Sequence, residues 1–298
     1  MKKLLDIKNY ILIHNGEIIT KEISEDIVAE NSTITVNQAT NLQIVYTGDM
    51  DIKNQITIQV ISPTLDLIET LAFSDEASLH RKLMVPKNGQ VTRYVNHLSD
   101  SQNNISIHDF VEVEENGNIT CAYVDFSDTN IVSNVQYDLI GKNAQAKLRL
   151  AALSKQEEKK QFEVHICHLA PHTTGSMDNY GIVKDSATLH IDGIGTIKQG
   201  NHQSDNQQIN KILVFNPKCV AIANPYLYID EYDVNAGHGA SVGKVDEEQL
   251  YYLQSRGLSQ EEALHLITYG YFIPVLEFIR NEEVKEQYNQ LLKEKVGI

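Results

Sequence analysis

Short runs of β-forming residues, separated by turn residues, recur along most of this chain. Between about Ile11 and Val234 the runs are rich in Ile, Val, Thr and Tyr, and Asn, Asp and Gly lie between them. Most runs alternate polar and apolar residues, as half-buried strands do. Examples are residues 32–36, 56–60, 119–124, 162–167 and 226–229. Because no convincing helical stretch interrupts the region from Asn104 onward, the pattern leaves a sandwich, a barrel or a solenoid.

The pattern becomes helical after about residue 245. Apolar residues fall at helical spacing as far as Gly257. Ser259 and Glu262 then form a capping box that opens a second helix, and a third is expected over about residues 281–295. Residues 154–160 are all polar and are expected to form a charged loop between strands. We therefore predict two domains, a β domain over 1–245 and a small helical domain over 246–298.

Charge and hydropathy restrict the partners and the location. Lys and Arg total 25 against 40 for Asp and Glu, a net charge of −15, so nucleic acid and anionic membrane surfaces are excluded as main partners. The N-terminus meets Asp6, Lys8 and Asn9 before an apolar stretch of useful length forms, which argues against a signal peptide. No apolar run reaches the roughly 18 residues that span a bilayer. A cytoplasmic protein is expected.

The cysteines limit the possible metal sites. Cys121, Cys167 and Cys219 are odd in number and widely spaced, which is typical of reduced thiols. Three thiolates cannot supply the four ligands of a Cys-only zinc site or cluster. Any metal site must therefore recruit His, Asp, Glu or a second subunit.

The densest set of metal-ligating side chains lies around Cys167, between His165, His168 and His172. On a strand, His165 and Cys167 point to one face and His168 to the other, so only part of the set could bind one ion. The alternative is that these side chains fill a β ladder and hydrogen-bond across it.

Other catalytic and nucleotide-binding patterns are absent. The glycine-rich segment 237–244 has one residue too many between Gly237 and Gly243 for a phosphate-binding loop, and Val245 replaces the magnesium-binding Ser or Thr. No Gly-x-Ser-x-Gly elbow of a serine hydrolase occurs. A carboxylate pair for glycoside hydrolysis remains an alternative, although no pair stands out.

Three segments occur together in this chain: PHTTGS at 171–176, QQINKILV at 207–214 and GHGASVGKVDEEQLYYLQSRGLS at 237–259. With these segments in this order, the chain resembles the SufB/SufD family of iron–sulfur cluster assembly proteins, well over about 105–298 and loosely before. The resemblance implies a right-handed parallel β-helix core with a C-terminal helical domain. It also implies a compact, SufD-like scaffold without catalytic activity, whose helical domain docks a SufC-like ABC ATPase. The last core strands would pair with a second copy or with a SufB-like subunit and hold a transient iron–sulfur cluster.

The resemblance also implies two metal ligands. His238 occupies the position of a functional histidine in the family, and its His-Gly-Ala context is similar to SufD. Cys219 lies where SufB carries an essential cysteine. Iron accepts thiolate and imidazole ligands, and a dimer interface doubles each donor. The competing reading is that His238 packs at a strand-to-helix junction, where Gly237 and Gly239 permit a tight turn. A β-helix carbohydrate-active enzyme is the alternative function.

Overall fold

The computed structural model describes residues 8–49 and 55–296. Of the three N-terminal residues that argue against a signal peptide, Asp6 lies outside this range. None of the described helices is both long and apolar enough to cross a membrane.

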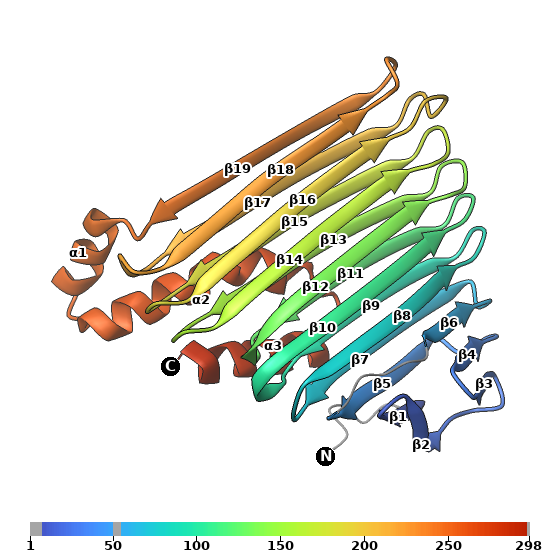
Figure 1. Cartoon of the computed structure of the whole chain (residues 1–298), viewed down its shortest axis with the longest axis horizontal. Helices are drawn as coiled ribbons and strands as arrows, with labels where there is room; N and C mark the ends of the chain where they lie inside the picture. Colours follow the sequence, from blue (N-terminus) through green and yellow to red (C-terminus); the bar gives the residue numbers. More distant parts are fainter. Residues whose placement is uncertain (1–7, 50–54, 297–298) are drawn as a thin grey trace.

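The described chain folds into a flattened parallel β-solenoid made of two facing sheets (Figure 1). Successive strands lie in opposite sheets from β4 onward, so each strand pairs in parallel with the strand two places along the chain. The strands of the 10-stranded sheet are β1 (Tyr10–His14), β2 (Glu17–Glu22), β5 (Asn41–Gly48), β7 (Thr64–Phe73), β9 (Gln90–His97), β11 (Asn118–Asp125), β13 (Gln145–Ser154), β15 (Thr174–Val183), β17 (Asp205–Val214) and β19 (Asn235–Lys244). The 9-stranded sheet contains β3 (Ile27–Glu30), β4 (Thr33–Val36), β6 (Ile56–Val60), β8 (Ala77–Val85), β10 (Asp100–Val113), β12 (Asp128–Leu139), β14 (Lys159–His168), β16 (Thr188–Ile197) and β18 (Val220–Ile229). Of the sandwich, the barrel and the solenoid that the sequence pattern allowed, the chain thus forms the solenoid.

Alternation of side chains fills the space between the sheets. In β8, Ala77, Leu79, Leu83 and Val85 point inward together with Arg81 and are buried, while the residues that alternate with these five are half-exposed. Parallel pairing in register stacks these aliphatic side chains on those of the next turn and forms one continuous core.

Asparagines at the ends of the strands make the turns. Asn88, Asn116 and Asn143 adopt positive φ of 59°, 54° and 61°. This left-handed backbone is one that Asn tolerates better than most residues. Their side chains form a ladder from turn to turn, because the Nδ2 of Asn116 donates to Asn88 and that of Asn143 donates to Asn116, at 3.1 and 2.9 Å.

Charged side chains interrupt the aliphatic core at inward positions of the strands. Lys160 is 1% exposed, and its Nζ lies 2.8 Å from a carboxylate oxygen of Asp125. The other oxygen of Asp125 lies 2.6 Å from the Nδ1 of His97. The expectation of a solvent loop over 154–160 is therefore correct only for the turn between β13 and β14, because Ser154 and Lys160 are buried strand residues.

Three helices follow the strands: α1 (Glu247–Ser255), α2 (Gln260–Phe278) and α3 (Glu282–Val296). The capping box of Ser259 and Glu262 is confirmed at the start of α2. Helices α2 and α3 pack on the outer face of the 10-stranded sheet, where Phe272, Val284 and Leu292 join a second buried cluster with outward residues of β9, β11, β13 and β15 (Figure 1). The division into two domains at 245/246 stays a prediction, since the helices share this core with the sheet.

The two ends of the solenoid differ. At the N-terminal end, antiparallel hairpins β1–β2 and β3–β4 cover the edges, and β2 is largely polar and exposed. At the C-terminal end, β18 and β19 are edge strands of ten residues each. Their exposed apolar side chains are Val220, Ile222, Tyr226, Tyr228, Ile229 and Val242. Long apolar edge strands are templates for pairing with another chain, so this end is open to association.

Candidate functional site at the open end of the solenoid

Cys219 directly precedes β18, on the side of the solenoid where β19 ends and α1 follows. It is half-buried, and its Sγ lies 3.6 Å from the backbone carbonyl oxygen of Asp185. The other two cysteines, Cys121 and Cys167, are buried. Burial raises the pKa of each of these two thiols to about 11, so neither is a ready thiolate at neutral pH. Cys219 is the thiol best placed to reach a ligand or a partner.

His238 lies within β19 and is exposed to solvent. The segment 237–244 is therefore a strand, whereas the sequence pattern ended the β region at Val234. Neither Gly237 nor Gly239 has positive φ, so the tight-turn reading of these glycines is wrong. Because the two neighbours of His238 have no side chains, its imidazole is accessible on the open edge of the sheet.

The structure separates Cys219 from His238 within one chain. Cys219 lies at the start of β18, and β19 returns in the opposite direction from a turn at the far end, where His238 is its fourth residue. Seven residues of strand rise place the two side chains on the order of 20 Å apart. They also lie in opposite sheets, since β18 pairs with β16 and β19 with β17. One solenoid turn thus does not bring them onto neighbouring strands.

The set around Cys167 divides between the two faces of β14, as expected. His165 and Cys167 face outward, and the Nε2 of His165 lies 2.9 Å from the hydroxyl of Thr196. His168 faces inward, is fully buried and bonds the hydroxyl of Thr173 at 2.7 Å. Burial lowers the pKa of His168 to about 4, which keeps the ring neutral. These contacts match the reading as a hydrogen-bonded β ladder.

His172 lies in a turn with φ of 59°, where its ring contacts that of His202 edge to face. Among the residues that the structure describes, no group of three His, Cys, Asp or Glu side chains is arranged to hold a metal ion.

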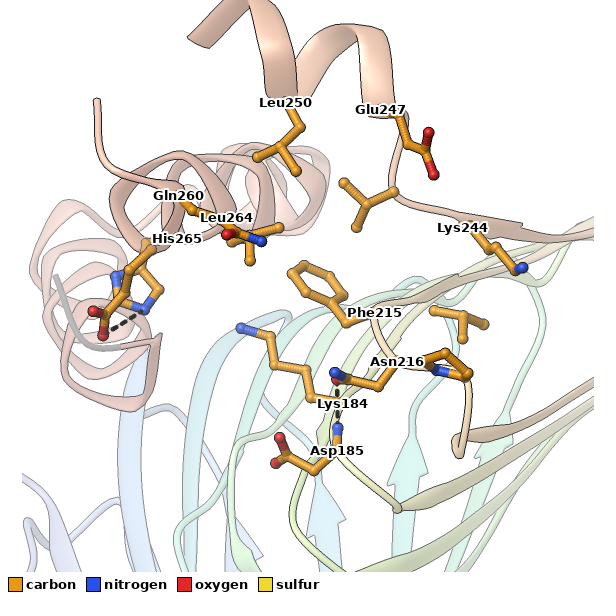
Figure 2. A pocket seen from close by; sticks show the side chains of 14 residues that line it. Lys184, Asp185, Phe215, Asn216, Lys244, Glu247, Leu250, Gln260, Leu264 and His265 are labelled. Carbon is orange, nitrogen blue, oxygen red and sulfur yellow. Dashed lines mark hydrogen bonds and ion pairs between the residues drawn. The ribbon is translucent and has the colours of Figure 1, made fainter. Parts of the chain in front are cut away.

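A pocket of about 640 Å³ lies between the open end of the solenoid and the helices α1 and α2 (Figure 2). Its lining residues are Lys184, Asp185, Val214, Phe215, Asn216, Pro217, Lys244, Val245, Glu247, Leu250, Gln260, Glu261, Leu264 and His265. Burial lowers the pKa of Lys184 to about 8, and the Nζ of Lys184 lies 4.5 Å from the ring centroid of Phe215. Cys219 adjoins this pocket through its contact with Asp185. No sequence motif marks Lys184, so sequence reasoning missed it.

The helices expose part of their aromatic surface. Tyr251 and Tyr252 of α1 are 74% and 55% exposed, and α1 has no buried residue. Phe272 is fully buried, while Tyr269 and Tyr271 pack partly against the sheet cluster. Of these five aromatic side chains, the two of α1 are therefore the most open to a partner.

Comparison with known proteins decides the family. The model for the SufBD core domain of SUF-system iron–sulfur cluster assembly matches residues 62–271, which include most of the solenoid and its open end. The chain belongs to the SufBD family of iron–sulfur cluster assembly proteins.

Curated relatives agree with this family. The chain is 36% identical over 170 residues to the iron–sulfur cluster assembly protein SufD of Bacillus subtilis, covering 57% of this chain and 39% of that protein. It is 28% identical over 154 residues to SufD of Escherichia coli, covering 52% and 36%. SufB of Bacillus subtilis is 29% identical over 155 residues, covering 52% and 33%. The matched region thus spans about two fifths or less of these relatives' lengths.

Proposed function

We propose that this SufBD family member is a non-catalytic cytoplasmic scaffold for iron–sulfur cluster assembly, working beside a SufC-like ABC ATPase. It pairs through β18 and β19 with a second copy or with a SufB-like subunit. A transient cluster is held at the interface, with Cys219 and His238 among its ligands. The open, apolar end of the solenoid carries this proposal.

The difference between the two ends of the solenoid supports pairing at the C-terminal end. Hairpins cover the N-terminal end, whereas no further strand pairs with the outer edges of β18 and β19, beside exposed Tyr226 and Tyr228. Burial of such edges against a second copy would satisfy the backbone groups and remove apolar surface from water.

Antiparallel pairing would also bring the two ligands together. Cys219 lies where β18 begins and β19 ends, and His238 lies near the opposite ends of these two strands. A two-fold axis perpendicular to the strands reverses their direction, so Cys219 of one copy approaches His238 of the other. Thiolate and imidazole from different chains then supply a ligand set that one chain lacks.

A complementation experiment tests this arrangement. After anaerobic reconstitution with iron and sulfide, Cys219→Ser and His238→Ala should each lose bound iron and the cluster absorption. Mixed and allowed to exchange subunits, the two variants should recover about a quarter of the wild-type iron, because half of the dimers then contain one complete site of two. Cys167→Ser is the matched thiol control and should retain the cluster. Unchanged iron in both single variants places the cluster elsewhere.

The ATPase contact is assigned to α1. Tyr251 and Tyr252 are exposed aromatic side chains of the kind enriched at protein interfaces. Deletion of 246–298 would uncover the apolar sheet face that α2 and α3 protect, so point variants are the sharper probe. Tyr251→Ala with Tyr252→Ala should abolish co-elution with the cognate ATPase on gel filtration, while circular dichroism stays unchanged. Replacement of exposed Ile19 at the other end of the solenoid should not affect binding. Retained binding by the double variant refutes the assignment.

The carbohydrate-active alternative gains no support from the relatives, which are named as assembly proteins. The acidic pocket near Asp100 and Asp128 is the best place for a carboxylate pair. Asp128, however, is paired with both Lys155 and Lys295, which suits anchoring of α3 to the solenoid.

A further inference from the structure

Three polar side chains converge on the outer face of the 9-stranded sheet, apart from Cys219 and His238. The Nε2 of His190 lies 2.9 Å from the Oδ1 of Asp192. The side-chain amide of Asn224 lies 2.8 Å from the same carboxylate oxygen and 3.2 Å from the same imidazole nitrogen. The three atoms therefore form a nearly equilateral triangle.

The solenoid fixes this triangle through its register. His190 and Asp192 are two residues apart on β16, so both point to one face, and Asn224 is directly opposite Asp192 on β18. Asp192 is 9% exposed, so the carboxylate is held in place by its neighbours. Helix α2 contacts β11, β13 and β15 of the other sheet, which leaves this face open to ions from solvent.

The edges of the triangle match the spacing between three neighbouring ligands around one metal ion. Two ligands at right angles around an ion, each about 2.1 Å from it, are about 3 Å apart. The observed edges of 2.8, 2.9 and 3.2 Å bracket this value. The oxygen and nitrogen of an amide side chain have nearly the same shape, so rotation of Asn224 by half a turn presents its oxygen to an ion at the same point.

The chemistry of the three groups selects the kind of ion. One imidazole nitrogen, one carboxylate oxygen and one amide oxygen form a mixed nitrogen–oxygen set, which suits divalent first-row transition metals better than soft Cu⁺. Without metal, the Nε2–H of His190 and the amide of Asn224 both donate to Asp192, so the same contacts hold the site together.

We propose that His190, Asp192 and Asn224 form a binding site for one divalent first-row transition metal ion, whose remaining positions are filled by water. The site lies next to the open edge because Asn224 belongs to β18. It does not depend on the proposed scaffold function, since it uses neither Cys219 nor His238.

Titration of the tag-free protein with Co²⁺ tests the proposal. The wild type should bind one ion with a new visible absorption, and crystals soaked in Co²⁺ should show anomalous density within the triangle. His190→Ala and Asp192→Ala should each weaken binding at least about tenfold. His165→Ala, a half-buried histidine on the same face, is the matched control and should leave the affinity unchanged.

A variant that adds a negative charge keeps the result independent of folding defects. Asn224→Asp adds a second carboxylate, so it should bind Co²⁺ more tightly than the wild type and gain thermal stability when the ion is added. Equal Co²⁺ affinity in the wild type, His190→Ala and Asn224→Asp, or anomalous density only at other histidines, overturns the proposal. Loss of the cluster in the Cys219 and His238 variants leaves it unaffected.

Discussion

A buried charge cluster inside the solenoid allows the sharpest stability prediction. Glu69, Arg81, Arg93 and Asp109 point inward from four successive strands and are each at most 2% exposed. Arg93 bonds Glu69 through its Nε at 2.5 Å, and Arg81 bonds both Glu69 and Asp109 at 3.0 and 2.9 Å. Two cations and two anions thus compensate one another away from water.

The change Glu69→Gln removes one anion and leaves the other three charges in place. Gln has nearly the same shape and still accepts the hydrogen bond that Tyr46 donates at 2.8 Å, so the lost negative charge dominates the effect. An unmatched buried cation remains, and breaking a buried pair in this way costs about 3–5 kcal/mol. Hydrogen exchange of β7 to β10 is the suitable measurement, because it reports local opening in a repeat structure that need not unfold as one unit.

The exposed pair of Lys87 and Glu115 supplies the control. Its atoms lie 2.6 Å apart, but the two side chains are 56% and 45% exposed. Glu115→Gln should therefore cost less than about 1 kcal/mol. If Glu69→Gln opens the strands no more than Glu115→Gln does, the reasoning about buried charge is refuted.

The acid dependence of stability gives a second measurement on the same variant. Burial alone would raise the pKa of Glu69, but Arg81 and Arg93 hold it at about 2. The folded carboxyl thus binds a proton less readily than the unfolded one. Its contribution is present above the ordinary pKa and is lost as the pH falls toward 2. Glu69→Gln should flatten this part of the stability profile.

Three further changes test other parts of the molecule. Burial lowers the pKa of Lys184 to about 8. Between about pH 8 and 10.5 the unfolded chain therefore holds more protons than the folded one, and the stability of the wild type should rise with pH. In thermal melts at pH 7 and 9.5, Lys184→Met should be more stable than the wild type at pH 7 and should lack this rise. A Cβ at Gly141 would meet the backbone nitrogen of Glu115 at 1.9 Å, whereas one at Gly243 meets nothing within 4 Å. Gly141→Ala should therefore lower the free energy of unfolding by about 1–3 kcal/mol, whereas Gly243→Ala should hardly change it. Tyr228→Glu on the open edge should shift the protein to monomers in light scattering; an unchanged dimer mass would contradict pairing through β18.

Much of the fold follows from local patterns in the sequence. Period-two alternation located strands such as β6 and β14, and the capping box of Ser259 located α2, because these signals depend on neighbouring residues alone. Strand β19 was missed because Gly237, Gly239 and Gly243 resemble a loop. Pairing with β17 overrides their low strand propensity.

The site could be predicted only in part. Family resemblance selected Cys219 and His238, but their separation depends on the direction of β18 and β19, which no local pattern reveals. Asn224 is remote in sequence from His190 and meets it only through the stacking of one turn on the next. Lys160 looked like part of a solvent loop because its buried partner Asp125 belongs to an earlier turn.

The ion pairs inside the solenoid also bear on how such a protein can change in length. An aliphatic turn stacks equally well on any similar turn, so a purely apolar solenoid tolerates gain or loss of a whole turn. Arg93 reaches Glu69 on the preceding turn, and Lys160 reaches Asp125 in the same way. A turn inserted between such partners would separate their charges by a further strand spacing of about 4.8 Å and leave both unmatched in the core. We therefore expect no gain or loss of whole turns in the segment between β7 and β14. Engineered extensions of this solenoid should be placed outside that segment.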